Sequence, residues 1–115
     1  MEIQQQNQNG LTVLTVRGDL SHDAAETLRA TGMATLQGDS RHLVLDCQDV
    51  KFIDSRGLQT LLWLQERCGE LLGQLRLARC PEHIRRVLEV TRLSSCFECH
   101  TDLDGAIASL GISPA

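Results

Sequence analysis

Residues 52–58 hold the side chains that are best placed in this chain to do chemistry. Asp54 and Ser55 stand side by side between an aliphatic run at residues 43–45 and a helical pattern that begins at Leu58. A short oxygen-bearing side chain at such a position caps a helix by accepting a hydrogen bond from a free amide of the first turn. The same amides and the helix dipole favour an added anion. Ser55 is therefore either a plain cap or a residue that can carry a phosphate.

A second chemical pattern is the run Cys-Phe-Glu-Cys-His at residues 96–100, which matches the attachment motif of c-type haem. Haem attachment normally requires export, and the first ten residues are rich in Gln and Asn rather than basic and then apolar. A zinc site would need more ligands, and Cys80 is the one other cysteine expected nearby. We expect instead a short edge strand at residues 97–100 whose thiols pack as small apolar groups, with no metal and no cofactor.

An enzymatic role for Ser55 lacks the neighbouring groups that nucleophilic catalysis requires. Asp19 or His22 could act as a base, but no Gly-x-Ser-x-Gly turn surrounds the serine, and a basic oxyanion cradle is not evident. The chain also has no Walker-type glycine-rich loop for a nucleoside triphosphate. The sequence therefore predicts that the protein is not an enzyme.

The elements that position Ser55 begin with a polar edge strand at residues 3–7 and a hairpin turn at residues 9–10. The turn leads into a strand at residues 11–17, where apolar side chains are frequent. A helix is predicted over residues 22–36, with the hydroxyl of Ser21 as its cap.

The second half of the chain continues to alternate strands and helices. The predicted elements are a strand at 41–47, a helix at 56–72, a strand at 74–79, a helix at 81–90 with Pro81 in its first position, and a last helix that is capped at 102–104 and ends at Leu110. Helices between strands require crossover connections, which favour parallel neighbours. We therefore predict an α/β fold with a mixed sheet of about five strands, antiparallel at its N-terminal hairpin, and about four helices mainly on one face.

Length and composition limit the class of protein. The 115 residues suit a single domain over 1–115. The net charge is −4 and only three residues are aromatic, so the chain lacks the basic surface and the stacking platform of a nucleic-acid-binding protein. No apolar run is long enough to cross a bilayer, and no signal peptide is evident, so we expect a cytoplasmic protein without membrane insertion.

Three stretches, in this order and spacing, resemble the STAS family, which includes the anti-sigma factor antagonists. Residues 46–58 read Asp-x-x-Asp-Val-x-Phe-Ile-Asp-Ser-x-Gly-Leu, which is similar to the family signature. Residues 14–20 resemble the strand that ends in Gly, an acidic residue and Leu before the first helix. Residues 75–81 resemble the strand that follows the signature helix. The resemblance covers nearly the whole chain and implies the same α/β fold.

The resemblance also implies a function in bacterial transcription. Ser55 would be phosphorylated by an anti-sigma factor that is also a serine kinase. The unphosphorylated domain would dock on that kinase and free a sigma factor, and phosphorylation would release the domain until a PP2C-type phosphatase restores it. We expect docking through the rim around Ser55. The residues expected to bind the partner there are Asp19, Ser21, Asp54, Arg56, Gly57 and Leu58.

Arg56 departs from the commonest family pattern, in which a second small hydroxyl residue often follows the phosphoacceptor. The side chain is either a solvated first-turn residue, or it pairs with phosphorylated Ser55 or with a carboxylate of the partner. The alternative function is a STAS scaffold subunit that binds a partner ATPase in a transport or stress-sensing complex, without phosphorylation control.

Overall fold

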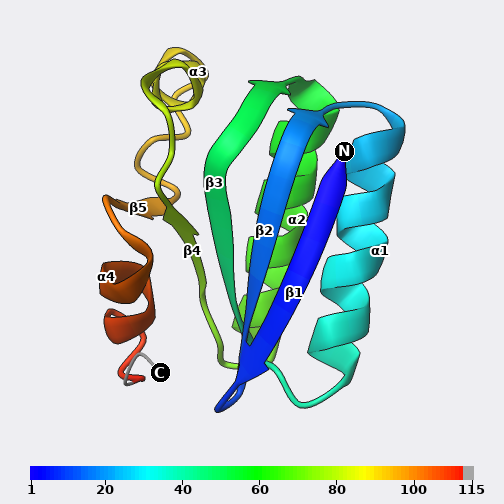
Figure 1. Ribbon diagram of the computed structural model, residues 1–115, viewed down its shortest axis with the longest axis vertical. Coiled ribbons are helices and arrows are strands. Elements are labelled where there is room, and N and C mark those ends of the chain that lie inside the picture. Colours follow the sequence, from blue (N-terminus) through cyan, green and yellow to red (C-terminus); the bar gives the residue numbers. More distant parts are fainter. Residues whose placement is uncertain (113–115) are drawn as a thin grey trace.

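The fold, seen in a computed structural model that describes residues 1–112, is built on one five-stranded sheet with the strand order β1-β2-β3-β4-β5 (Figure 1). β1 pairs antiparallel with β2 through the hairpin turn, and the other neighbours are parallel. The predicted mixed sheet is therefore confirmed, while the last three residues of the predicted domain 1–115 lie outside the described part. The strands are β1 (Glu2–Gln8), β2 (Leu11–Leu20), β3 (His42–Ile53), β4 (Leu75–Ala78) and β5 (Glu98–His100).

Four helices cover the sheet: α1 (Asp23–Gln37), α2 (Ser55–Glu70), α3 (Glu82–Val90) and α4 (Leu103–Ala108). Figure 1 shows α1 and α2 running side by side. Because successive side chains of a strand point to opposite faces, Leu14 and Leu45 pack with α1, α2 and α3 in the larger apolar cluster. Val13 and Val44 face the smaller cluster under α4. Helices thus lie mainly on one face, as predicted, and within residues 1–112 none has the length and apolar character to cross a membrane.

Two central strands are longer than their apolar runs. β2 continues to Leu20 and β3 to Ile53, whereas the sequence predicted ends at residues 17 and 47. Polar side chains at positions 48, 49 and 51 interrupt the aliphatic pattern. The parallel pairing of β2 with β3 nevertheless continues across two irregularities to the pair Leu20 and Ile53. Backbone pairing therefore carries both strands to the rim at which Ser55 lies.

Several element ends differ from the prediction. Ser21 does not cap α1: the capping position is held by His22, with a φ of 46° and no side-chain hydrogen bond to the helix. Ser21 contributes only its backbone carbonyl, which accepts a bond from the Ala24 N–H at 3.0 Å. Pro81 occupies the capping position of α3 and not its first turn. Other ends also differ from the prediction by one to a few residues; for example, α2 spans Ser55–Glu70, β5 begins at Glu98, and α4 ends at Ala108.

Candidate functional site

Asp54 and Ser55 occupy different positions at the start of α2. Asp54 is the capping residue, and its Oδ1 accepts a hydrogen bond from the Gly57 N–H at 2.9 Å. Ser55 is the first residue of the helix and is exposed. Because the carboxylate of Asp54 does the capping, the hydroxyl of Ser55 is left facing solvent beside the free amides of the first turn.

The helix start is held against the end of β2. The Asp54 N–H donates to the Leu20 carbonyl at 3.3 Å, and the backbone of Gly57 lies close to the same carbonyl. A Cβ added at Gly57 would stand 2.3 Å from the Leu20 oxygen and 2.7 Å from Cγ1 of Ile53. Only glycine fits this contact without a shift, so Gly57 fixes how near α2 comes to the rim.

The predicted partner-binding residues separate into two groups. Asp19 and Arg56 are exposed, and Ser21 and Asp54 are half-buried, so all four lie at the surface of the rim. Gly57 and Leu58 are buried. Their place in the structure is beneath the rim, where they position α2.

Phe52 is a member of this rim that the sequence analysis did not select. It lies opposite Asp19 in the pairing of β2 with β3, and 53% of its surface is exposed. An exposed aromatic side chain is a frequent anchor of protein–protein contacts. The sequence placed the end of this strand at residue 47, so the face on which Phe52 lies could not be assigned. Alternation from the buried Ile53 would have indicated it.

The start of α2 stabilises the negative charge of the Asp54 carboxylate. The hydrogen bond from the Gly57 N–H lowers the pKa of the Asp54 carboxyl, and His22 adds to the effect, with its Nε2 4.0 Å from Oδ2 of Asp54. The Asp54 side chain is therefore ionised at neutral pH and remains the cap. An anion added at Ser55 would meet the positive end of the helix dipole and also this fixed carboxylate.

The cysteines do not assemble a metal site within the described residues. In residues 1–112 there is no group of three or more His, Cys, Asp or Glu side chains that could hold a metal ion. Cys96 and Cys99 are exposed, and Cys96 lies before β5 rather than inside a strand. Cys99 lies near Cys80, and this contact raises the pKa of the Cys99 thiol. Because Cys96 and Cys99 are exposed, the expectation that their thiols pack as small apolar groups is wrong.

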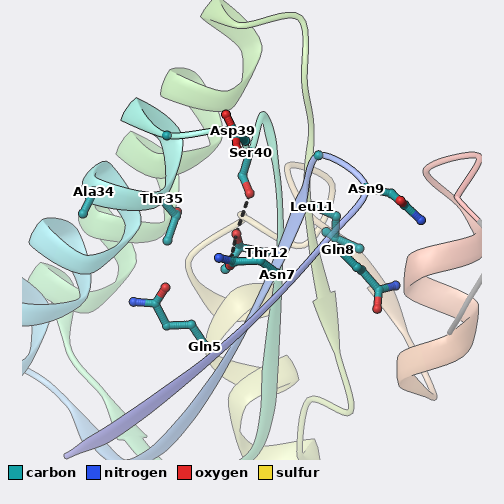
Figure 2. Close-up of a pocket in the computed structure, with 12 residues that line it drawn as sticks. Gln5, Asn7, Gln8, Asn9, Leu11, Thr12, Ala34, Thr35, Asp39 and Ser40 are labelled. Carbon is teal, nitrogen blue, oxygen red and sulfur yellow. Dashed lines mark hydrogen bonds between the residues drawn. The ribbon is translucent and has the colours of Figure 1, made fainter.

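A cavity of about 570 Å³ lies at the other end of the sheet, between the β1–β2 hairpin and the end of α1 (Figure 2). Its side chains are mainly amides and hydroxyls, and the Thr12 and Ser40 hydroxyl oxygens are 2.6 Å apart. Thr12 Oγ1 also donates to Oδ1 of Asn7 at 2.8 Å. Because this cavity lies at the opposite end of β2 from the rim at which Ser55 lies, it is not the candidate site.

The chain matches a known family model and a curated relative. The family model described as "Mlab, STAS domain" matches residues 3–98. BtrV, a candidate anti-sigma factor antagonist of Bordetella bronchiseptica, is 27% identical over 101 residues, which are 88% of this chain and 87% of BtrV.

Two solved structures have the same fold. The anti-sigma factor antagonist SpoIIAA in its unphosphorylated form superposes with a TM-score of 0.82 at 21% identity, covering 98% of this chain and 100% of that one. The Bacillus cell fate determinant SpoIIAA in its phosphorylated form superposes with a TM-score of 0.75 at 21% identity, covering 94% of this chain and 98% of that one.

Proposed function

The chain belongs to the STAS domain family, and on that basis we propose that it is an anti-sigma factor antagonist controlled by phosphorylation of Ser55. The observation that carries this proposal is the position of Ser55, exposed as the first residue of α2 while Asp54 does the capping. Relatives with the name of anti-sigma factor antagonist support the class of partner. The protein would act by binding, in the cytoplasm, and not as an enzyme.

The unphosphorylated domain docks on an anti-sigma factor that is also a serine kinase, using the rim formed by Asp19, Phe52 and Arg56 around Ser55. In the kinase reaction, Oγ of Ser55 bonds to the γ-phosphorus of ATP and the bond to the bridging oxygen breaks. ADP leaves, and the hydroxyl proton passes to a base of the kinase. A PP2C-type phosphatase later transfers the phosphoryl group to water and restores the serine.

The charge of the phosphate accounts for release. Phosphorylation adds roughly −1.5 to −2 charges at pH 7. In the free domain, solvent and the helix start stabilise this charge. In the docked complex the phosphate would lose the water that screens its repulsion from the ionised Asp54, so it would need a matching cation from the partner. Phosphorylation therefore favours the free domain.

Phosphate mapping tests the proposal directly. The purified protein is incubated with ATP and the anti-sigma factor serine kinase encoded in the same genome, and the modified residue is identified by mass spectrometry. We expect one phosphate, on Ser55, and none on a Ser55→Ala variant. Modification of Ser21, Ser94 or Ser95 with Ser55 unmodified would contradict the assignment.

A further inference from the structure

A groove of about 410 Å³ lies between α1 and α2. Glu26 and Arg29 line it from α1, and Arg56, Gln59 and Trp63 line it from α2. Arg56 belongs both to this lining and to the rim proposed for docking, so the groove adjoins the rim. A partner that docks at the rim and extends across α1 and α2 would therefore contact this groove.

Arg29 is held in place by Trp63. The guanidinium carbon of Arg29 lies 4.2 Å from the centroid of the indole ring, a distance at which a cation interacts with the face of an aromatic ring. Arg67 also approaches this ring, at 5.4 Å, but it is paired with Glu66 at 3.3 Å and with Glu70 at 2.9 Å. The charge of Arg67 is therefore compensated, while Arg29 is positioned by stacking.

The two arginines that line the groove are free to pair with a ligand. Among the ion pairs of residues 1–112, none joins a carboxylate to Arg29 or Arg56 within 4.0 Å. Glu26 is the single acidic side chain in the lining. The groove thus carries a local positive charge on a chain whose net charge is −4. A guanidinium with unused donors is suited to bind a carboxylate through two parallel hydrogen bonds.

We propose that this groove binds an acidic segment of the anti-sigma factor, with Arg29 and Arg56 as its carboxylate ligands and Trp63 as the apolar floor. The inference rests on the proposed function, and it extends the docking surface from the rim onto α1. It also gives Arg56 a role: in the docked state this residue pairs with the partner. A phosphate on the adjacent Ser55 would compete for Arg56 and repel the acidic segment, which links phosphorylation to release.

Charge reversal tests the groove. The affinity of the anti-sigma factor serine kinase is measured by calorimetry for the wild type, Arg29→Glu and Arg56→Glu, each in the unphosphorylated form. We expect each reversal to weaken binding about tenfold or more, because it places like charges together. Arg92→Glu is the matched control, since Arg92 is exposed and follows α3 by two residues, and α3 lies well apart from α1 (Figure 1). This variant should bind within about twofold of the wild type.

Further variants and an ATP titration separate a role of the groove in partner binding from a loss of folding and from binding of a small anion. Circular dichroism checks the fold of each variant, and Arg29→Gln, which removes the charge without repulsion, replaces Arg29→Glu if the latter unfolds. Unchanged affinity of the Arg29 variants, with wild-type binding intact, would overturn the groove and leave the proposed function standing. Failure of the wild type to bind the kinase would overturn both the groove proposal and the proposed function. Trp63 is the one tryptophan of the chain, and a shift of its emission on addition of ATP alone would assign the groove to a small anion instead.

Discussion

Asp54 and Ser55 have separate tasks, although the sequence permits either residue to cap α2. The carboxylate of Asp54 accepts from the Gly57 N–H, and this bond lowers the pKa of the carboxyl, so the cap persists at neutral pH. Ser55 is thereby left exposed. Modification of Ser55 changes the charge of the rim without removing the cap of the helix, which is what a reversible binding switch requires.

Charge at Ser55 should control partner binding. Ser55→Asp should weaken binding to the anti-sigma factor serine kinase, while Ser55→Ala should retain affinity and lose the response to ATP. The coupling energy expected for such a switch is about 1 to 3 kcal/mol, and the aspartate should give a partial effect because it carries about one charge. Calorimetric titration of both variants measures this. Equal affinities would show that charge at this helix start is not the control.

At the scale of elements, the contact between α2 and the end of β2 decides where Ser55 stands. Gly57→Ala should destabilise the protein by about 1 to 3 kcal/mol, because the new Cβ meets the Leu20 carbonyl and Cγ1 of Ile53. Gly69→Ala, in the same helix, is the matched control: no atom lies within 4 Å of its added Cβ, and the change should stabilise by about 0.5 to 1 kcal/mol. Urea unfolding compares the two. Destabilisation of the same size in both would refute the close contact.

Periodicity predicted the order of the elements but not their ends. Most strands and helices of residues 1–112 follow from apolar patterns, whereas the polar strand β1 follows from its hairpin turn and the mixed sheet from the crossover connections. The end of β3 was missed because its last residues are held by pairing with β2 and not by a repeated apolar pattern. The exposure of Phe52 and the stacking of Arg29 on Trp63 depend on tertiary placement, so local sequence could not reveal them.

For the molecule as a whole, two buried polar side chains of β3 are accommodated in different ways. Asp46 is paired with Arg79: the Asp46 side chain is 2% exposed and accepts from Nε of Arg79 at 3.1 Å. His42, at the start of the same strand, is buried without an anionic partner, and its Nδ1 accepts from the Gln74 N–H at 3.0 Å. Pairing allows Asp46 to keep its charge in the interior, whereas His42 is stable there in its neutral form.

Global stability should therefore fall on mild acidification. Burial lowers the pKa of His42 below its ordinary value of 6.5, and the positive charges of Arg41 and Arg76 lower it further. Below about pH 6.5 the unfolded chain then binds more protons than the folded one. The free energy of unfolding therefore rises with pH in this window, and the contribution of neutral His42 to stability is lost as pH falls toward the folded pKa. Urea unfolding between about pH 8 and pH 5.5, above the range in which most carboxylates titrate, measures the loss. His42→Gln should flatten the profile, because it removes the group whose pKa burial lowers. A His42→Gln profile as steep as the wild type would assign the acid sensitivity to another group.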